Sequence, residues 1–328
     1  MIIAEAGVNH NGDINLAYRL CDGAKKAGAD VVKFQTWKTD AIVTKSVNQA
    51  KYQMDSKNKQ ESQYDMLKKL ELSKEEFKSI KQYCDKIGIV FASTADDPES
   101  LDFLTSLGLP FIKVGSGEMG NISYLRYIGS KKLPIIMSTG MSSLADIDYS
   151  LKALREGGST DITLLHCTTS YPCKYQDVNL KAMLTIRDAF HLPVGYSDHT
   201  LGNIVSVAAV AMGASIIEKH FTLDKNMEGP DHKASLDVGE FKCLVNDIRN
   251  IEKSMGNGIK EPTEEEKSNS KVVLKRIVAK HYIEKGSIIG ENDICLKRNE
   301  RGLPSKYWDI LLGRRAIRCF DKDEGIEL

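Results

Sequence analysis

A repeated unit organises the first two thirds of this chain. Each unit is a short, β-branched apolar run that ends in polar or glycine residues and is followed by a charged, amphipathic segment. Such alternation predicts βα units and a parallel sheet. Eight strands close a parallel barrel, so the sequence predicts an α/β protein with a (β/α)8 TIM barrel. The eight runs begin at Met1, Ala29, Ile89, Phe111, Pro134, Ile162, Pro193 and Ala214.

The segments between the runs carry helix signals. Residues 15–27 place apolar side chains on one face, and Gly28 follows as a stop. Residues 73–76 (SKEE) form a capping box, and Ser142 or Ser143 can cap a later helix. An open, doubly wound sheet is the alternative architecture, which the lack of a GxGxxG motif after the first run disfavours.

Two regions depart from a minimal barrel. Residues 37–72 form a long polar and aromatic insertion after the second run, which is either a solvated loop or, as we expect, a substrate lid. The barrel is expected to end at residue 258, and residues 259–271 mix Gly, Pro and charge as a linker does. Residues 272–328 predict a small, mostly β domain, whose thin core suggests that it docks on another surface.

Composition excludes some classes of partner. Lys plus Arg and Asp plus Glu are both 45, so no net field recruits nucleic acid or an acidic membrane. The sequence starts without a basic signal-peptide region and has no apolar run near the roughly 20 residues of a membrane span. Its seven cysteines lack CxxC spacing, which is typical of reduced thiols in the cytoplasm.

Polar side chains gather at the ends of the predicted strands, where barrel enzymes bind their substrates. Lys33 and Lys113 each stand between apolar residues, and an unpaired buried charge is costly. They either pair with Glu5 or Glu118 across the barrel mouth or form an anion site, which is the interpretation we favour. The neighbouring hydroxyls fit phosphoenolpyruvate, which carries a phosphate and a carboxylate. These hydroxyls belong to Thr94, Ser116, Ser138 and Ser197.

Two histidines, His199 and His220, end the last two runs. With carboxylates at Glu5, Glu218 and Asp231 they suggest a divalent metal site, which suits Mn²⁺ better than Zn²⁺ because zinc usually takes three protein ligands.

Other histidine and cysteine residues give weaker signals. His166 lies inside an apolar run and is expected to make an interior hydrogen bond. Cys167 follows it directly, but adjacent strand residues point to opposite faces and cannot pair. The sequence has neither a GxSxG motif nor a P-loop.

Taken together, the motifs resemble a known family. AEAGVNHNGD, ADVVKFQT, VGSGE, MSTGM, LLHCT with a following YP, GYSDHT and EKHFTLDK…GPDH occur in the order seen in the sialic acid synthases. These are the N-acetylneuraminate synthases and the related legionaminic and pseudaminic acid synthases. The segment KGSIIGENDICLKRN is similar to that family's C-terminal antifreeze-like (SAF) domain.

The resemblance implies a reaction and a set of roles. Phosphoenolpyruvate would condense with N-acetylmannosamine, or alternatively with a 2,4-diacetamido-6-deoxy hexose, with C–O cleavage and a divalent metal (Mn²⁺, with Mg²⁺ or Co²⁺ as alternatives). The family forms a domain-swapped homodimer. The implied catalytic acids are Glu5, Glu118 and Asp231; the phosphoenolpyruvate contacts are Lys33, Thr94, Lys113, Ser116, Ser138 and Ser197; the sugar contacts are Gln35, Tyr171 and Arg298; and the metal ligands are His199 and His220.

Two segments differ from the family pattern. Residues 93–97 read STADD where an aromatic-Asp pair is expected, and residues 298–302 read RNERG in place of Arg-Pro-Gly. The second difference makes the loop that carries Arg298 less rigid. A non-catalytic sugar- or ice-binding protein is the remaining alternative, but it leaves the lysines and histidines at the strand ends without a purpose.

Overall fold

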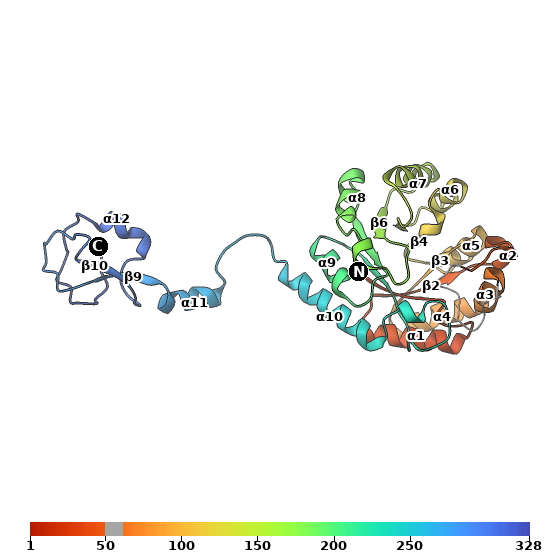
Figure 1. Cartoon of the computed structure of the whole chain (residues 1–328), viewed down its shortest axis with the longest axis horizontal. Coiled ribbons are helices and arrows are strands. Elements are labelled where there is room, and N and C mark those ends of the chain that lie inside the picture. Colours follow the sequence, from red (N-terminus) through yellow and green to blue (C-terminus); the bar gives the residue numbers. More distant parts are fainter. Residues whose placement is uncertain (50–61) are drawn as a thin grey trace. The chain divides into compact units, whose positions relative to one another are not determined.

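The computed structural model describes residues 1–49 and 62–328. The chain divides into two compact units, Met1–Gly256 and Asn257–Leu328 (Figure 1). Part of the predicted lid, residues 50–61, lies outside the described residues. Among those that are described, no helix is both long and apolar enough to cross a lipid bilayer.

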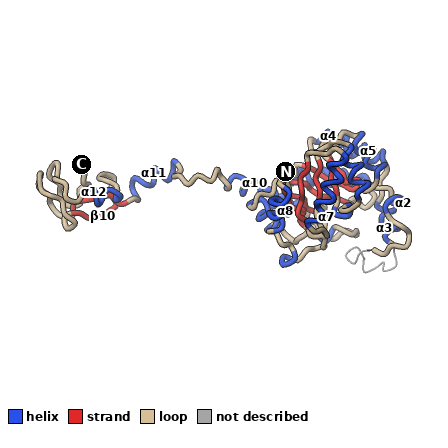
Figure 2. The backbone as a smooth tube through the Cα atoms, turned by 90° about the horizontal axis from the view of Figure 1, so that it is seen from above, coloured by secondary structure: helices blue, strands red, loops and turns tan. Residues whose placement is uncertain are grey.

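The first unit is a closed barrel of parallel strands in sequential order, and β1 pairs with β8 to complete it. The predicted barrel is therefore confirmed, and the open-sheet alternative is wrong. Figure 2 shows the strands enclosed by helices. The strands are β1 (Ile2–Gly7), β2 (Val31–Thr36), β3 (Val90–Ala95), β4 (Ile112–Val114), β5 (Ile135–Ser138), β6 (Ile162–Cys167), β7 (Val194–Asp198) and β8 (Ile217–His220).

The helices of this unit begin and end at the expected signals. Ser73 and Ser143 each form a capping box, and Gly28 ends the first helix in the left-handed conformation at φ 86°. The helices are α1 (Ile14–Ala27), α2 (Thr39–Ile42), α3 (Gln63–Leu70), α4 (Lys74–Ile87), α5 (Pro98–Ser106), α6 (Ile122–Ser130), α7 (Leu144–Gly157), α8 (Ala182–Phe190), α9 (Ile204–Ala211) and α10 (Val238–Ser254).

Strand alternation sorts the barrel residues into two sets. Outward side chains such as Val32 and Phe34 join the main hydrophobic core between strands and helices. Inward side chains form a separate apolar layer inside the barrel, and the next inward position on several strands is polar. The apolar layer consists of Ile3, Val31, Ala92, Phe111, Ile136, Leu165 and Ile216. This layer is the floor on which the polar residues of the barrel mouth stand.

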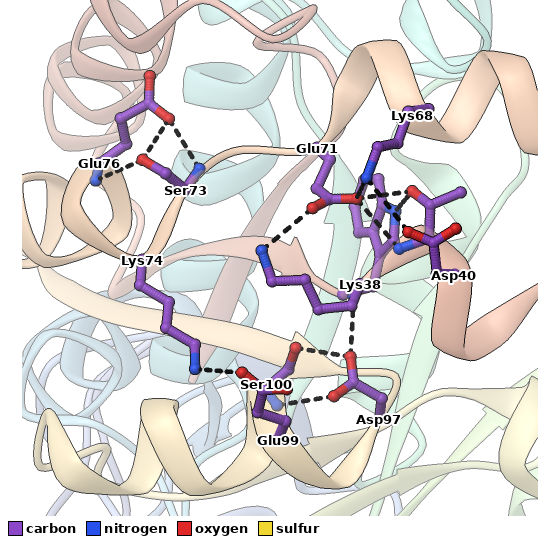
Figure 3. A network of polar contacts seen from close by, with 12 residues as sticks. Lys38, Asp40, Lys68, Glu71, Ser73, Lys74, Glu76, Asp97, Glu99 and Ser100 are labelled. Carbon is purple, nitrogen blue, oxygen red and sulfur yellow. Dashed lines mark hydrogen bonds and ion pairs between the residues drawn. The ribbon is translucent and has the colours of Figure 1, made fainter.

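A polar network anchors the part of the insertion that follows the undescribed residues (Figure 3). The Glu71 carboxylate accepts hydrogen bonds from the Lys38 ammonium at 3.1 Å and from the Thr39 backbone N–H and hydroxyl at 3.1 and 2.8 Å. Lys68 of α3 donates to the same carboxylate at 3.3 Å. The carboxyl end of α3 is thereby tied to the start of α2.

The residues 93–97 that depart from the family pattern build an ordinary helix start. Asp97 is the N-cap of α5 and accepts from the Ser100 backbone N–H at 2.8 Å. It also accepts from the Lys38 backbone N–H at 2.9 Å, so the β3–α5 loop is joined to the β2–α2 loop.

The second unit contains a two-stranded antiparallel sheet, β9 (Lys275–Ala279) with β10 (Ile294–Arg298), and the helices α11 (Glu264–Val273) and α12 (Trp308–Leu311). Isolated bridges such as Ile283 with Phe320 extend the pairing. The unit has its own buried cluster, which includes Ile277, Leu311 and Phe320. α11 has no buried residue and occupies much of the predicted linker.

Candidate active site

Barrel register brings the polar strand positions to one level. Glu5 lies opposite Lys33 on one side and His220 on the other, and Thr94 lies opposite Lys113. Ser197 stands opposite Glu218. Residues that are far apart in the sequence are therefore neighbours around the mouth of the barrel.

Lys33 is the centre of the first group of contacts. Its ammonium lies 2.6 Å from Oε2 of Glu5 and donates to the Thr94 hydroxyl at 3.0 Å. Oε2 of Glu218 is 3.7 Å away. Lys33 therefore forms the ion pair with Glu5 that was one of the two predictions. An ammonium has three N–H groups, so one of them can still face a ligand.

Lys113 forms the second group and does not pair with Glu118. Its ammonium donates to the Ser138 hydroxyl at 2.7 Å and to the Val114 carbonyl at 3.1 Å. Oε1 of Glu218 is 3.6 Å away and accepts from the Ser197 hydroxyl at 3.1 Å. Both lysines thus share one buried carboxylate, Glu218, and hydroxyl groups surround them.

The two histidines lie together beside this cluster. Their ring centroids are 5.5 Å apart, and the ring of Tyr171 is 4.1 Å from that of His199. Nδ1 of His199 is 2.8 Å from the Thr168 carbonyl, which can only accept, so in the neutral imidazole this nitrogen carries the proton and Nε2 has a free lone pair. Nδ1 of His220 is buried, has no hydrogen-bond partner and lies 3.6 Å from Oδ2 of Asp231.

These imidazoles fit a divalent metal that also takes oxygen ligands, since each offers a ring nitrogen. Within residues 1–49 and 62–328, however, no three His, Cys, Asp or Glu side chains come together as a ready-made metal site. A metal held here would complete its coordination with water or substrate.

Gln35 and Asp231 meet Glu5 next to the histidines. Gln35 donates its amide N–H to Oε1 of Glu5 at 2.9 Å. A Cβ added at Gly7 would lie 3.3 to 3.5 Å from the side chains of Glu5, Gln35 and Asp231, so the three converge on one point. Gly7 has φ 51°, which glycine adopts without strain.

Burial and charge perturb the acids and bases of the cluster. Burial raises the pKa of Glu218, but Lys113 and Lys33 outweigh it and lower the value to about 2. Burial raises the pKa of Glu5 against the pull of Lys33, and it lowers the pKa of Lys113. Glu218 is therefore the carboxylate that stays ionised between the lysines.

The histidine side of the site is also perturbed. Burial lowers the pKa of His220 to about 4, and it raises the pKa of Asp231. Sγ of Cys167 lies 3.8 Å from Nδ1 of His199. Burial opposes ionisation of this pair, but their contact lowers the pKa of Cys167 and raises that of His199.

Three further residues are implied by the resemblance. Ser116 accepts from the Gly140 backbone N–H at 2.9 Å on the Cys167 side of the site. Glu118, two residues later, accepts from Asn121 at 2.7 Å, and burial raises its pKa. Arg298 is exposed at the end of β10 in the second unit.

Sequence reasoning grouped Glu218 with the histidines rather than with the lysines, and it did not consider Asp96. Glu218 is two residues before His220, and strand alternation alone could have placed both on the inner face. Asp96 follows β3, and burial, then Glu118, raise its pKa to about 7. His166 makes the expected interior hydrogen bond, from Nε2 to the Val178 carbonyl at 2.7 Å.

Two cavities adjoin the cluster. One of about 720 Å³ lies between the loops after β5 and β6 and is lined by Thr139, Met141 and Cys167, among others. The second, of about 100 Å³, lies beside Gln35, His220 and Asp231.

The fold and the site together define the class of this protein as a TIM-barrel enzyme. The strands form a closed parallel barrel, and buried lysines, carboxylates and two histidines gather at the carboxyl ends of those strands. The sequence profile of the NeuB family matches residues 20–260, and the chain belongs to this family.

Curated relatives and solved structures agree with this assignment. The chain is 48% identical to the N,N'-diacetyllegionaminic acid synthase of Campylobacter jejuni over 99% of this chain and 98% of that protein. It is 47% identical to the enzyme of the same name from Legionella pneumophila, over 96% and 90% of the two chains. The N-acetylneuraminic acid (sialic acid) synthetase of Leptospira borgpetersenii, solved with citrate, superposes with a TM-score of 0.71 at 34% identity, covering 82% of this chain and 89% of that one.

Proposed function

We propose that this chain is a nonulosonic acid synthase, which condenses phosphoenolpyruvate with an N-acyl amino-sugar aldehyde and releases phosphate. The observation that carries the proposal is the pair of buried lysines that share Glu218 beside two histidines at the barrel mouth. A barrel interior has no structural need for two ammonium groups, whereas a small, multiply charged anion does. The names of the two bacterial relatives support the same reaction class.

The phosphoenolpyruvate site is proposed around Lys33 and Lys113. An ammonium has three N–H donors. Lys33 faces Glu5 and Thr94 with two of them, and Lys113 uses two on Ser138 and Val114. The Glu218 oxygens lie 3.7 and 3.6 Å from the two ammonium groups, beyond hydrogen-bond distance, so each lysine retains one N–H for a ligand oxygen. Ser197 and Ser116 supply further hydroxyls from neighbouring strands and loops.

His199 and His220 are the proposed ligands of a divalent metal, Mn²⁺ first, with Mg²⁺ and Co²⁺ as alternatives. Charge balance supports it, because the two lysines are already matched by the two carboxylates Glu5 and Glu218. A bound phosphoenolpyruvate anion would leave the buried site negative without a further cation. When bound, such a metal polarises the aldehyde oxygen.

The residues of the chain then orient the reactants. Lys33 and Lys113 hold the anion while C3 of phosphoenolpyruvate forms a bond to the aldehyde carbon. Water adds to C2, and the C–O bond to phosphate breaks. We assign to Glu5 and Asp231 the role of holding the proton that this water loses, since both converge near Gly7 and Asp231 lies 3.6 Å from His220. That proton balances the one that the aldehyde oxygen takes up as it becomes a hydroxyl. Glu118 is a more distant acid, turned toward Asn121.

Gln35 and Tyr171 are the proposed sugar contacts in this unit. One amide N–H of Gln35 donates to Glu5. The amide oxygen of Gln35 can then accept a hydrogen bond from a sugar hydroxyl or N–H. The aldehyde is either N-acetylmannosamine or a 2,4-diacetamido-6-deoxy hexose. The names of the two bacterial relatives favour the second sugar.

We further propose that the second unit is an antifreeze-like (SAF) domain and that the protein is a domain-swapped homodimer in the cytoplasm. In such a dimer, Arg298 would enter the partner subunit's active site. The exposed position of Arg298 on β10 supports this role, and the seven free cysteines support a reducing compartment. The segment from residue 37 to 72 is proposed as the lid over the sugar.

A phosphate-release assay tests the function directly. Purified protein with Mn²⁺ and phosphoenolpyruvate should release phosphate only when a suitable amino-sugar aldehyde is added. The His199→Ala variant should lose this turnover, whereas His191→Ala, on the outer end of α8, should keep it. An absence of phosphate with every such aldehyde, in metal-loaded protein, would contradict the proposal.

A further inference from the structure

The small cavity beside His220 has two chemically different walls. Gln35, His220 and Asp231 form a polar wall that is continuous with the active site. The opposite wall is apolar and comes from α3 and the β1–α1 loop. Its members are Val8, Met66, Leu67 and Leu70, and Tyr171 and Pro230 complete the lining of the cavity.

The side chains of the apolar wall are packed against one another. Val8, Met66 and Leu70 are buried in a hydrophobic cluster with Trp37, which is separate from the main core. Leu67 is only partly buried and packs against the same cluster. An apolar side chain that lines a polar site displaces water without giving a hydrogen bond in return.

Two contacts fix α3 in this position. The first is the Glu71 network, which ties Lys68 of α3 to the start of α2 (Figure 3). The second is Gly12, where an added Cβ would lie only 2.5 Å from the Lys69 carbonyl oxygen. The wall is therefore held from both the β2 and the β1 loops.

We propose that Met66, Leu67 and Leu70 of α3, with Val8, determine which aldehyde the enzyme accepts. The inference rests on the proposed function. A sugar whose aldehyde carbon lies near His199 and His220 would extend through this cavity and end against α3. That wall suits a methyl group, as in a 6-deoxy sugar. It disfavours a hydroxymethyl group, because a hydroxyl placed against α3 would lose its hydrogen bonds to water and gain none from the side chains of Met66, Leu67 and Leu70.

The charge of the residues that line the cavity also favours an uncharged sugar. Of the described residues that line it, none is a lysine or arginine. A phosphorylated sugar would bring a dianion next to Asp231, where none of these described lining residues offers a permanent cation. The preferred substrate class is thus an uncharged 6-deoxy amino sugar.

The first test needs only the unmodified enzyme. Phosphate release is measured with three aldehydes: a 2,4-diacetamido-6-deoxy hexose, N-acetylmannosamine and its 6-phosphate. We expect kcat/KM for the 6-deoxy sugar to exceed that for N-acetylmannosamine by about tenfold or more, the range that one substituent in an apolar pocket can give. The 6-phosphate should be the poorest substrate.

The second test changes the wall. Leu67→Gln, which adds a hydrogen-bonding group, should lower the ratio of kcat/KM values (6-deoxy sugar over N-acetylmannosamine) about fivefold or more. Leu67→Met should preserve it. Leu133→Gln, a partly buried leucine before β5 at the other end of the barrel, is the matched control and should leave the ratio unchanged.

The outcomes separate the two proposals. Turnover of N-acetylmannosamine or its phosphate as good as that of the 6-deoxy sugar would overturn the specificity inference and leave the synthase function standing. An unchanged ratio in a folded Leu67→Gln enzyme would do the same. No phosphate release with any of the three sugars would overturn the function itself.

Discussion

The ammonium of Lys33 lies 2.6 Å from Oε2 of Glu5, and both side chains are almost completely buried at the mouth of the barrel. The two residues are register partners on β1 and β2, so the backbone pairing itself brings them together. The ion pair keeps Lys33 charged and oriented toward Glu218 and Thr94. The same contact therefore stabilises the fold and prepares the anion site.

Lys33→Met should separate these two roles. It leaves the Glu5 carboxylate buried without its partner, which typically costs about 3–5 kcal/mol of unfolding free energy. The double variant Lys33→Met/Glu5→Gln should recover most of that stability, because the orphaned charge is gone. Neither variant should bind phosphoenolpyruvate measurably. Urea unfolding and calorimetric titration measure the two effects, and anion binding by the double variant at wild-type strength would contradict the role of Lys33.

Gly140 leaves room for the hydroxyls of Thr169 and of Ser116, and Ser116 belongs to the proposed anion site. An added Cβ would lie 2.2 Å from Oγ1 of Thr169 and 2.8 Å from Oγ of Ser116. Gly140→Ala should therefore displace Ser116 and raise KM for phosphoenolpyruvate about tenfold or more, with a smaller change for the aldehyde. Gly117→Ala is the control, since a Cβ there meets nothing within 4 Å. Equal KM values in both variants would remove Ser116 from the site.

The barrel could be predicted because strand and helix periodicity are local properties of the sequence. The eight apolar runs became the eight strands, and the capping residues Ser73 and Ser143 start helices where expected. These signals depend on residues within one turn or one strand. They do not require knowledge of which elements become neighbours.

The site was predicted less completely because its contacts depend on face and register. Lys113 and Lys219 look alike at their strand ends, yet Lys219 points outward and pairs with Asp198 at 2.7 Å in the outer layer. Glu218 lies one residue earlier and points inward between the two active-site lysines. A sequence shows that charges are present, but only the closed barrel shows which of them share a space.

Gly12 has φ 75° and sits against the backbone of α3. Gly12→Ala should push α3 away from the sugar cavity and raise KM for the aldehyde several-fold, while KM for phosphoenolpyruvate stays constant. Gly108→Ala is a matched control, because Gly108 has φ 76° but nothing within 4 Å of an added Cβ. Both variants bear the same backbone strain. A similar KM for the aldehyde in the two proteins would show that the position of α3 is unimportant.

Glu71 should make stability depend on pH. Burial opposes its ionisation, but the Thr39 backbone and hydroxyl and the lysines Lys38 and Lys68 lower its pKa to about 2. Because the folded value lies below the unfolded one, its stabilisation is full above about pH 5 and is lost as the pH falls toward 2. Glu71→Gln should cost about 1–3 kcal/mol of unfolding free energy at pH 7 and little near pH 2. The exposed Glu75→Gln is the control. If the loss of unfolding free energy in Glu71→Gln were the same at pH 7 and near pH 2, the stabilisation would not come from the charge of Glu71.

Arg298 allows a direct test of the domain-swapped dimer. His199→Ala loses the proposed metal ligand, and Arg298→Ala loses the proposed sugar contact, so each protein alone should be nearly inactive. If Arg298 acts in the partner subunit, mixed dimers contain one site with both residues intact. Co-expression of the two variants should then restore about a quarter of wild-type activity, because half the dimers are mixed and one of their two sites is complete. The mixed dimers can be isolated with two affinity tags and their mass checked by light scattering. Activity no greater than the sum of the single variants, in verified mixed dimers, would mean that Arg298 does not act across the dimer.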